Sequence, residues 1–408
     1  MRCLVLFCLF VLYFRTGLCK PLLGGGSHDI WSEVDESDNG LVEGALAGNG
    51  SRLPRVLNFF PVPVEEECLS KDGRRRGICM NTYECRIQGG SSHGKCAMGF
   101  GVCCVFTLTC NQEVINNITY FVNPDFPDLT SSITSCNLTV KKIDEEIAQL
   151  RLDFIHFNLG QPNRKTGVCE EDVFTMSGGE NRMLKLCGFN SGQHAYFDVE
   201  GITGPIEITM LLNRKAVSRL WELTVTQIPF SQRAPMGCLQ YHQGMKGTIQ
   251  TMNFADNGRH LADQDYTICI REEEGMCSIA YEPCHEDSFK IAPNNNSTLT
   301  NAVVIDEVEG SGGGVEGVQA RDMQQECVDR VILPCDNEDL IMVGEGGPST
   351  CSLVHCGESL CPENESPCRI ESSSTPFTVG IHFEENSRES PADDNLGMCL
   401  IYEQLPCN

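Results

Sequence analysis

Short runs in which apolar and polar residues alternate are the clearest pattern in this chain. Phe377, Val379, Ile381 and Phe383 form the cleanest of these runs. A period of two is typical of β-strands that bury one face and expose the other. Turn signals such as Asn190-Ser191-Gly192 separate the runs, so the pattern predicts an all-β fold. The other alternating runs cover residues 150–154, 206–210, 221–225, 266–270 and 277–281.

The predicted strands form two stretches. The first begins at Cys110 and has the length of a β-sandwich, and its out-of-phase continuation at Phe157 and Leu159 predicts a bulged strand. The second begins at Cys238 and is interrupted by a polar insert at about residues 285–325, rich in Asn and Gly. A segment of that length and composition is expected to be a disordered loop.

The N-terminus carries the only long apolar run. Residues 4–14 follow Arg2 and are too short to span a bilayer, which is typical of a secretory signal peptide. We expect a signal peptide at residues 1–19, with cleavage after Cys19. Because no second apolar stretch is long enough for a membrane span, we expect a secreted, extracellular protein.

Charge and cysteine content narrow the classes of function. The chain has 56 Asp and Glu residues against 30 Lys and Arg, a net charge of −26, which disfavours nucleic-acid binding. It also has 25 cysteines, and loss of Cys3, Cys8 and Cys19 with the signal peptide leaves an even number. An even number favours complete disulfide pairing in an oxidising compartment.

Two segments separate the signal peptide from the strands. Residues 20–66 are rich in Gly, Ser, Asp and Glu, which predicts a disordered pro-segment or linker. Residues 67–105 contain six cysteines in a segment too small to bury a sufficient core, so three crosslinks should hold it. The spacing leaves the connectivity open, although the adjacent Cys103 and Cys104 are expected to take different partners.

Five separate Asn-x-Ser/Thr triplets predict N-glycosylation on surface loops. They begin at Asn49, Asn117, Asn137, Asn296 and Asn364.

Residues 110–230 resemble a CUB domain, because several motifs of that family occur in order. The resemblance implies a jelly-roll-like β-sandwich with disulfides Cys110–Cys136 and Cys169–Cys187. The residues that carry it are Phe121 to Pro127, Cys136, Leu150 to Phe157, Cys169 to Asp172, Leu186 to Gly188 and Ser218 to Trp221.

Residues 235–408 resemble a divergent second copy, of the kind found in secreted arthropod CUB proteins. Cys327-Val328-Asp329 and Cys356-Gly357 echo the third and fourth cysteine motifs of the first copy. This segment has 12 cysteines, more than a CUB domain usually has. By cysteine spacing, residues 67–105 resemble the clip-like modules of arthropod secreted proteases.

Many CUB domains bind Ca²⁺ through a Glu and two Asp residues, since carboxylate oxygens are the ligands that Ca²⁺ prefers. Asp172 matches one of these positions and is the one candidate metal ligand. The Glu position is Gly160 here. We therefore expect no Ca²⁺ and no other cofactor, with Asp172 instead accepting hydrogen bonds from backbone N–H groups.

The sequence predicts no enzyme. It contains neither the Gly-Asp-Ser-Gly-Gly loop of serine proteases nor a His-Glu-x-x-His zinc motif. Gly90-Ser91-Ser92-His93-Gly94 has the form of a nucleophile elbow, but it lies among six cysteines and is expected to be a flexible turn. Trp221 is expected in the core, with the charge of Arg219 exposed beside it.

Arg74, Arg75 and Arg76 form a basic run of three between Cys68 and Cys79. One interpretation is a protease-recognition loop, since trypsin-like and furin-like proteases bind Arg in an acidic pocket. The alternative is a solvated cationic loop, or one that binds an anionic surface such as a glycosaminoglycan.

The sequence therefore favours a secreted, non-catalytic protein-interaction protein, whose partner is an extracellular or cell-surface protein. The alternative is a regulator, an inhibitor or a non-catalytic cofactor, of extracellular trypsin-like or clip-type proteases. In that case the partner is a secreted protease and residues 74–76 form the recognition loop.

Overall fold

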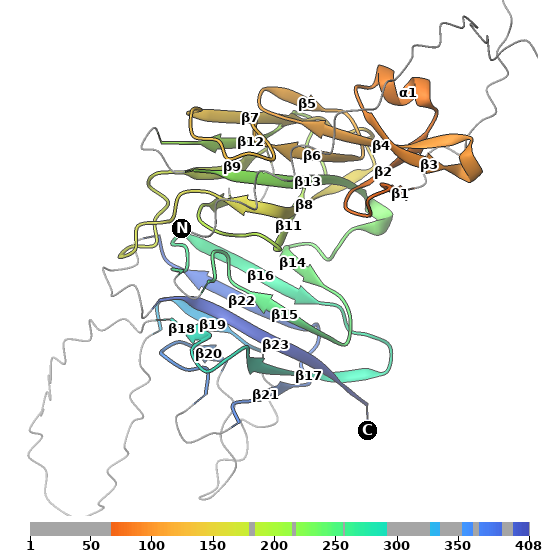
Figure 1. Cartoon of the computed structure of the whole chain (residues 1–408). Coiled ribbons are helices and arrows are strands. Elements are labelled where there is room, and N and C mark those ends of the chain that lie inside the picture. The colour runs from red at the N-terminus through yellow and green to blue at the C-terminus, as the bar shows by residue number, and fades with distance from the viewer. Residues whose placement is uncertain are drawn as a thin grey trace, which may run out of the picture. The chain divides into compact units, whose positions relative to one another are not determined.

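The computed structural model describes residues 67–178, 184–213, 218–255, 258–291, 327–334, 353–361, 367–385 and 395–407 (Figure 1). The signal peptide, the linker 20–66, Asn49, Asn296 and Asn364 lie outside these residues. Within them nearly all of the regular secondary structure is β-strand. The all-β prediction is confirmed, with two CUB-like sandwiches and a disulfide-rich N-terminal module. Among the described residues, no helix is long and apolar enough to cross a bilayer.

The six-cysteine module and the first sandwich contain thirteen strands and one α-helix. The helix α1 begins after Asn81, whose side chain accepts a hydrogen bond from the N–H group of Tyr83 and so caps it. The elements are β1 (Glu67–Leu69), β2 (Arg76–Met80), α1 (Thr82–Ile87), β3 (Ser91–Cys96), η1 (Ala97–Gly99), β4 (Gly101–Leu108), β5 (Gln112–Val114), β6 (Ile118–Val122), β7 (Ser135–Val140), β8 (Ile147–Asn158), β9 (Val173–Ser177), β10 (Lys185–Leu186), β11 (His194–Asp198), β12 (Ile206–Leu211), β13 (Leu220–Pro229) and η2 (Phe230–Gln232).

Two sheets form the first sandwich. One has the strand order β1-β2-β4-β6-β13-β8-β11, with β3 also paired to β4, and the other has the order β10-β9-β12-β7-β5. Their inner faces bury a core that includes Phe154, Phe174 and Trp221. The expected bulge is present: Glu222 pairs with His156 and Leu223 with Phe154, so Ile155 is the extra residue.

The six-cysteine module shares a sheet with the first sandwich. β4 lies between β2 and β3, which both pair with its residues 102–104, and its later residues 106–108 run parallel to β6, where Phe106 lies opposite Thr119. One strand therefore crosses the predicted boundary at residues 105–110. The three disulfides of the module are Cys68–Cys103, Cys79–Cys96 and Cys85–Cys104, so the adjacent cysteines have different partners.

The second sandwich also consists of two sheets, with the strand orders β14-β16-β22-β19-β20 and β15-β23-β17-β21; β18 pairs with β23. Its separate core includes Tyr281, Phe377 and Tyr402. The strands are β14 (Cys238–His242), β15 (Lys246–Gln250), β16 (Gln264–Ile270), β17 (Met276–Pro283), β18 (Phe289–Lys290), β19 (Arg330–Ile332), β20 (Val354–His355), β21 (Ile370–Ser372), β22 (Thr378–Phe383) and β23 (Gly397–Pro406).

The polar insert starts later than the sequence indicates. Residues 285–291 belong to the second sandwich, because Phe289 pairs with Met398 and both Phe289 and Ile291 are buried. These two apolar residues follow a polar stretch and do not alternate over a full strand, so periodicity did not identify them. The remainder of the expected insert, up to residue 325, lies outside the described residues.

Candidate functional site

The aspartate that follows the third cysteine of the first sandwich lies in a buried ion pair. Asp172 and Arg219 are both fully buried. Nε of Arg219 donates to Oδ2 of Asp172 at 2.7 Å, and Nη2 donates to Oδ1 at 2.8 Å. The sequence placed the charge of Arg219 at the surface, and that expectation is wrong. The bidentate partner lies 47 residues away, and a guanidinium that is paired with a carboxylate can be buried.

Backbone groups complete the shell around Asp172. The N–H of Gly160 donates to Oδ2 at 2.7 Å, and the N–H of Asn213 donates to Oδ1 at 3.0 Å. Burial alone would raise the pKa of Asp172, but the hydrogen bonds from Arg219, Gly160 and Asn213 outweigh it and hold the pKa below its ordinary value.

These residues do not fit a Ca²⁺ ion. Both oxygens of Asp172 are committed to Arg219, whose positive charge lies where a cation would have to bind. Gly160 adds no ligand, and a Cβ atom built there would lie 3.0 Å from Oδ2 of Asp172. Nowhere in the described ranges do three His, Cys, Asp or Glu side chains group in a way that suits a metal ion.

The second sandwich has an aspartate at the equivalent position, in different surroundings. Asp329 accepts a hydrogen bond from the N–H of Glu384 at 2.8 Å, and its Oδ2 lies 3.8 Å from Nε2 of His260. Burial raises the pKa of Asp329 and lowers the pKa of His260 to about 4. His260 stacks against Phe383, with their ring centroids 4.1 Å apart.

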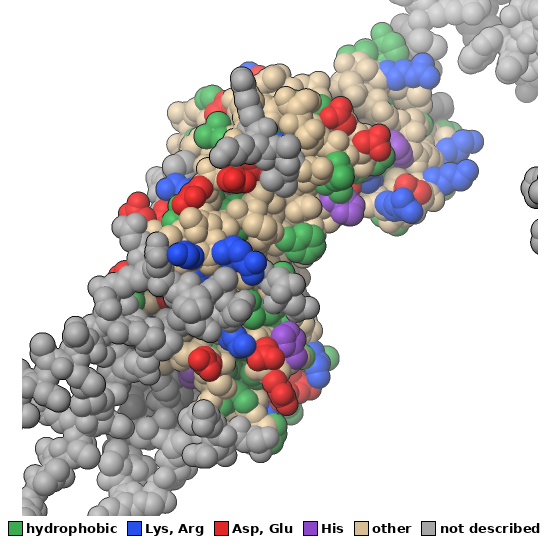
Figure 2. All heavy atoms as spheres, turned by 60° about the vertical axis from the view of Figure 1, so that its left-hand side comes forward, with side chains coloured by type: hydrophobic (Ala, Val, Ile, Leu, Met, Phe, Trp, Pro, Cys, Tyr) green, Lys and Arg blue, Asp and Glu red, His purple; other side chains and the backbone are tan. Residues whose placement is uncertain are grey.

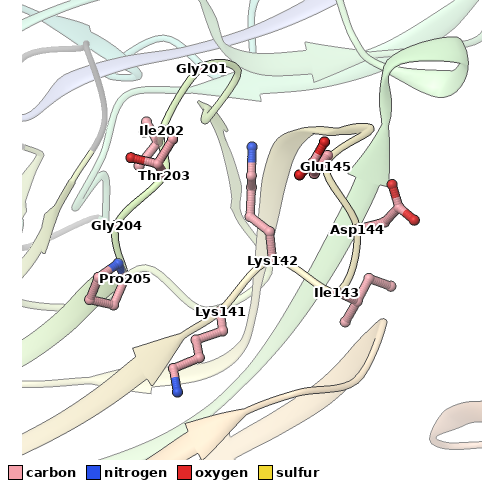
Figure 3. Close-up of a pocket in the computed structure, with 10 residues that line it drawn as sticks. All are labelled: Lys141, Lys142, Ile143, Asp144, Glu145, Gly201, Ile202, Thr203, Gly204 and Pro205. Carbon is pink, nitrogen blue, oxygen red and sulfur yellow. The ribbon is translucent and has the colours of Figure 1, made fainter.

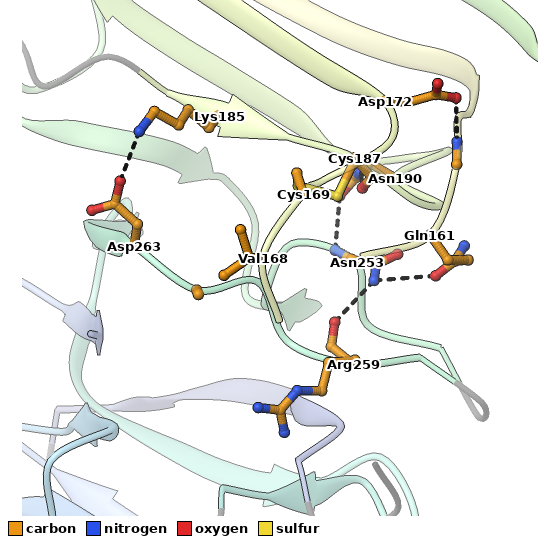
Figure 4. Close-up of a disulfide and its surroundings, with 12 residues drawn as sticks. Gln161, Val168, Cys169, Asp172, Lys185, Cys187, Asn190, Asn253, Arg259 and Asp263 are labelled. Carbon is orange, nitrogen blue, oxygen red and sulfur yellow. Dashed lines mark hydrogen bonds and ion pairs between the residues drawn. A yellow bond between two sulfur atoms is a disulfide. The ribbon is translucent and has the colours of Figure 1, made fainter. Parts of the chain in front are cut away.

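The two sandwiches meet in a buried polar junction centred on Asn253 (Figure 4). The N–H of Asn253 donates to Oδ1 of Asn190, and the N–H of Phe189 donates to Oδ1 of Asn253, both at 2.8 Å. Nδ2 of Asn253 donates to the carbonyl of Arg259 at 2.9 Å. Gly188 lets Asn253 approach, because a Cβ atom on Gly188 would overlap Oδ1 of Asn253.

Apolar side chains reinforce this junction. Met252 and Leu261, which belong to the second stretch of the chain, pack in the core of the first sandwich. Nζ of Lys185 and Oδ2 of Asp263 form an ion pair across the junction at 3.2 Å (Figure 4). The sequence gives little sign of this junction, since its residues come from loops without periodic patterns.

The three consecutive arginines have different environments. Arg74 is exposed, whereas Arg75 binds Glu222 of the first sandwich through Nη2 at 2.6 Å and lies over the ring of Tyr120. Arg76 lies in β2, where its N–H donates to the hydroxyl of Tyr120. Arg75 therefore attaches the six-cysteine module to the first sandwich, and a protease would reach residues 75 and 76 only by disrupting this contact.

The other sequence-predicted positions are distributed over the first part of the chain. The structure has the disulfides Cys110–Cys136 and Cys169–Cys187. Asn137 is exposed on β7, and Asn117 is half-buried before β6. Ser91, Ser92 and His93 lie in β3, which pairs antiparallel with β4, so the flexible turn expected there is wrong. A nucleophile elbow needs a sharp turn between a strand and a helix, and these residues lie within a strand instead.

A pocket of about 670 Å³ lies between the loops 141–145 and 201–205 of the first sandwich (Figure 3). Lys142 belongs to the first of these loops, and its side chain extends between the two (Figure 3). Its Nζ donates to the carbonyls of Ile147 and Val199, each at 3.2 Å. Nζ of Lys141 pairs with Glu113 at 2.8 Å. Because both ammonium groups already have partners, the pocket offers no charged group of its own to an anionic ligand.

Comparison with protein families finds a match for the second sandwich. Residues 235–405 match the family model of the animal CUB domain. The match covers the copy that the sequence resemblance placed as the divergent one. The comparison with curated proteins finds no match to this chain.

Several solved structures align with a large part of this chain. The CUB1-EGF-CUB2 domains of rat MASP-1 are 13% identical and align over 73% of this chain and 99% of that chain, with a TM-score of 0.23. The CUB1-EGF-CUB2 domain of human MASP-1/3 is 16% identical and aligns over 71% of this chain and 100% of that chain, with a TM-score of 0.23. The full extracellular region of zebrafish Gpr126/Adgrg6 is 11% identical and aligns over 72% of this chain and 36% of that chain, with a TM-score of 0.25.

Proposed function

We propose that this chain is a secreted, non-catalytic protein that binds another extracellular or cell-surface protein. The observation that carries the proposal is the match of residues 235–405 to the animal CUB domain, because CUB domains are extracellular protein-interaction modules. The ten disulfides among the described residues support an oxidising compartment, as does the signal peptide expected at residues 1–19.

We further propose that the first sandwich is a second CUB domain. Its strand order matches that of the matched domain, and its two disulfides have counterparts in Cys238–Cys269 and Cys327–Cys356. The arthropod origin and the clip-like character of residues 67–105 stay predictions from the sequence.

The junction at Asn253 supports a role in which a partner contacts both sandwiches together. Buried hydrogen bonds and a shared apolar core restrain their relative motion, and preorganised surfaces lose less entropy on binding. The loops at the ends of the strands are then free to vary in sequence while the scaffold stays fixed.

Affinity capture with the purified mature protein tests the proposal. Candidate partners are the extracellular proteins that bind saturably to the native protein and not to the same protein after reduction and unfolding. A single reproducible partner is the expected result. Catalytic turnover that co-purifies with the chain, in the absence of any saturable partner, would contradict the proposal.

Regulation of a trypsin-like protease is the second candidate, and the exposed Arg74 supports it. The turn that carries Arg74 is stiff for two reasons. The N–H of Ser70 donates to the carbonyl of Arg75, and the disulfide-bonded Cys68 and Cys79 lie on either side of the turn. Incubation with trypsin-like proteases and comparison with Arg74→Ala tests this role. Altered protease activity that depends on Arg74 supports it, whereas activity unchanged by the protein rules it out.

We propose that neither sandwich needs a bound metal or other cofactor. In the first sandwich, the pairing of Asp172 with Arg219 supports this proposal, because the guanidinium supplies the positive charge internally.

A further inference from the structure

Positive charge is concentrated in one part of an otherwise acidic chain. Residues 67–108 contain six Lys and Arg residues and three Asp and Glu residues. Residues 235–408 contain eight Lys and Arg residues against 30 Asp and Glu. The six-cysteine module is therefore basic, while the rest of the chain repels polyanions.

Three exposed cations of the module lie on two segments that are joined to each other, while the exposed Arg76 and Arg86 lie on β2 and α1. The N–H of Lys71, in the turn between β1 and β2, donates to the carbonyl of His93 in β3 at 2.7 Å. Arg74 belongs to the same turn, and Lys95 to the same strand as His93. We call Lys71, Arg74 and Lys95 the basic turn surface. In Figure 2, several Lys and Arg side chains gather at the upper right, where the module lies.

This surface is rigid. The hydroxyl of Ser70 and the N–H of Arg74 both donate to Oδ1 of Asp72, which fixes the turn from within. The disulfides Cys68–Cys103 and Cys79–Cys96 hold the strands on either side of it. The backbone that carries these cations is therefore already ordered when a ligand binds.

The charges of the basic turn surface are available to a ligand. Within the described residues, Lys71, Arg74 and Lys95 are exposed and form no ion pair. Their neighbours differ, since Arg75 pairs with Glu222 and Arg76 with Glu67. The only acidic side chain of the turn, Asp72, is already hydrogen-bonded to Ser70 and Arg74.

We propose that the basic turn surface binds a sulfated polysaccharide, a role that goes beyond the protein binding proposed for the sandwiches. Sulfate groups keep their charge at every physiological pH and repeat along a linear chain, so several can reach neighbouring cations at once. Such a chain can contact the module without crossing the acidic second sandwich. An extracellular protein with one basic end would in this way be retained in a polyanionic matrix while its sandwiches bind their partner.

Heparin is the probe for this proposal. We compare retention of the full mature protein on immobilised heparin with that of Lys71→Ala/Arg74→Ala/Lys95→Ala, at increasing salt. The matched control is Lys141→Ala/Lys246→Ala/Arg271→Ala, which removes three exposed cations from the sandwiches. All variants are checked by thermal unfolding, because these exposed side chains contribute little to stability.

The expected result is salt-sensitive retention that the basic-turn variant reduces by about tenfold or more in affinity, while the control changes it less than about twofold. Desulfated heparin should not bind. Equal losses in both triple variants would overturn the proposal, because they would indicate diffuse charge attraction.

A second variant distinguishes a protein-binding surface from a polysaccharide site. Met98 and Phe100 are exposed in the same module, and a protein partner would bury such apolar side chains whereas heparin would not. Met98→Ser/Phe100→Ser should leave heparin binding unchanged, and loss of binding in this variant would refute the proposal. Capture of a partner by the sandwiches should survive the basic-turn variant, so the two proposals can fail separately.

Discussion

The two sandwiches are built on the same plan but stabilise equivalent positions differently. The order β10-β9-β12-β7-β5 of the first sandwich corresponds to β20-β19-β22-β16-β14 of the second, and β6-β13-β8-β11 corresponds to β15-β23-β17-β21. In both sandwiches one pair of strands near the first cysteine is parallel. β5, which follows Cys110, runs parallel to β7, and β14, which contains Cys238, runs parallel to β16. At the aspartate after the third cysteine, however, Asp172 faces an arginine and Asp329 faces a histidine.

This difference separates what fixes the fold from what is free to change. Strand order, alternation and two disulfides are common to both copies, so these features specify the sandwich. The loops around the aspartate tolerate different solutions, provided that the buried carboxylate is satisfied. In the first sandwich a full ion pair satisfies it. In the second a backbone N–H group donates to it, His260 lies 3.8 Å away, and the charge of Arg259 acts on it from a greater distance.

The largest effect is expected from Arg219→Ala. It leaves Asp172 as an unpaired buried carboxylate, so the free energy of unfolding should fall by about 3–5 kcal/mol. Denaturant unfolding followed by Trp221 fluorescence measures this, since Trp221 lies in the core of the first sandwich. Asp329→Asn, the matched change in the second sandwich, should cost less than about 1 kcal/mol because Asn keeps the acceptor for the N–H of Glu384.

A control variant checks that burial is the cause. Arg233 forms a surface pair with Glu200 at 2.7 Å, and Arg233→Ala should cost no more than about 1 kcal/mol. Equal effects of the Arg219 and Arg233 variants would show that the buried pair has no special role.

The next largest effect concerns the junction between the sandwiches. Gly188→Ala introduces a Cβ atom that overlaps Asn253 and strains a positive φ of 74°, so it should destabilise by about 2–4 kcal/mol. Gly192→Ala is the matched control, because φ is 85° there and a Cβ atom meets nothing within 4 Å. Gly192→Ala should lower the free energy of unfolding by about 1 kcal/mol. Limited proteolysis between residues 230 and 262 should accelerate only in the first variant; equal rates would contradict the proposed restraint of the junction.

A smaller effect follows from His260. Its pKa is about 4 in the fold against an ordinary 6.5, because burial disfavours the charged ring. The unfolded chain therefore binds a proton here that the folded chain does not, and the contribution of His260 to stability should fall by about 1–2 kcal/mol between pH 7 and pH 5. His194 and His242, whose pKa values burial also lowers to about 4, should add to this loss. In the first sandwich the pKa of Asp172 is lowered, so the stability from that group is lost only at more acidic pH.

Two variants test the assignment to His260. His260→Gln should reduce the loss of stability between pH 7 and pH 5 by about 1–2 kcal/mol, and His260→Gln/His194→Gln should reduce it further, because burial lowers the pKa of both histidines. Denaturant unfolding at both pH values gives the comparison. An unchanged pH dependence in His260→Gln would exclude this histidine as a source.

The smallest effect is expected from Ca²⁺. Since Arg219 already occupies both oxygens of Asp172, adding Ca²⁺ or a chelator should shift the melting temperature by less than about 1 °C. Differential scanning calorimetry measures the shift. A rise of several degrees that Asp172→Asn abolishes would place a metal ion in the first sandwich.

Part of this architecture is predictable from sequence. The alternation at residues 377–383 and 206–210 predicted β22 and β12, because a strand with one buried face has a period of two. Trp221 lies fully buried in the core, as expected for an apolar residue on such a strand. These features depend on neighbouring residues, which the sequence displays directly.

The features that sequence did not reveal depend on distant residues. Arg219 was expected at the surface because its partner is not adjacent in sequence, and Arg75 looked like one of three equivalent loop cations. The parallel pairing of β4 with β6, which joins the module to the sandwich, leaves no periodic signal that separates it from two independent domains. Long-range pairing of this kind becomes visible only in the folded chain.

Disulfide mapping tests the common plan of the two sandwiches most directly. Proteolysis of the non-reduced secreted protein followed by mass spectrometry should recover Cys110–Cys136 with its counterpart Cys238–Cys269, and Cys169–Cys187 with its counterpart Cys327–Cys356. A crosslink that joins a cysteine of one sandwich to a cysteine of the other, or free thiols at these eight positions, would contradict the account.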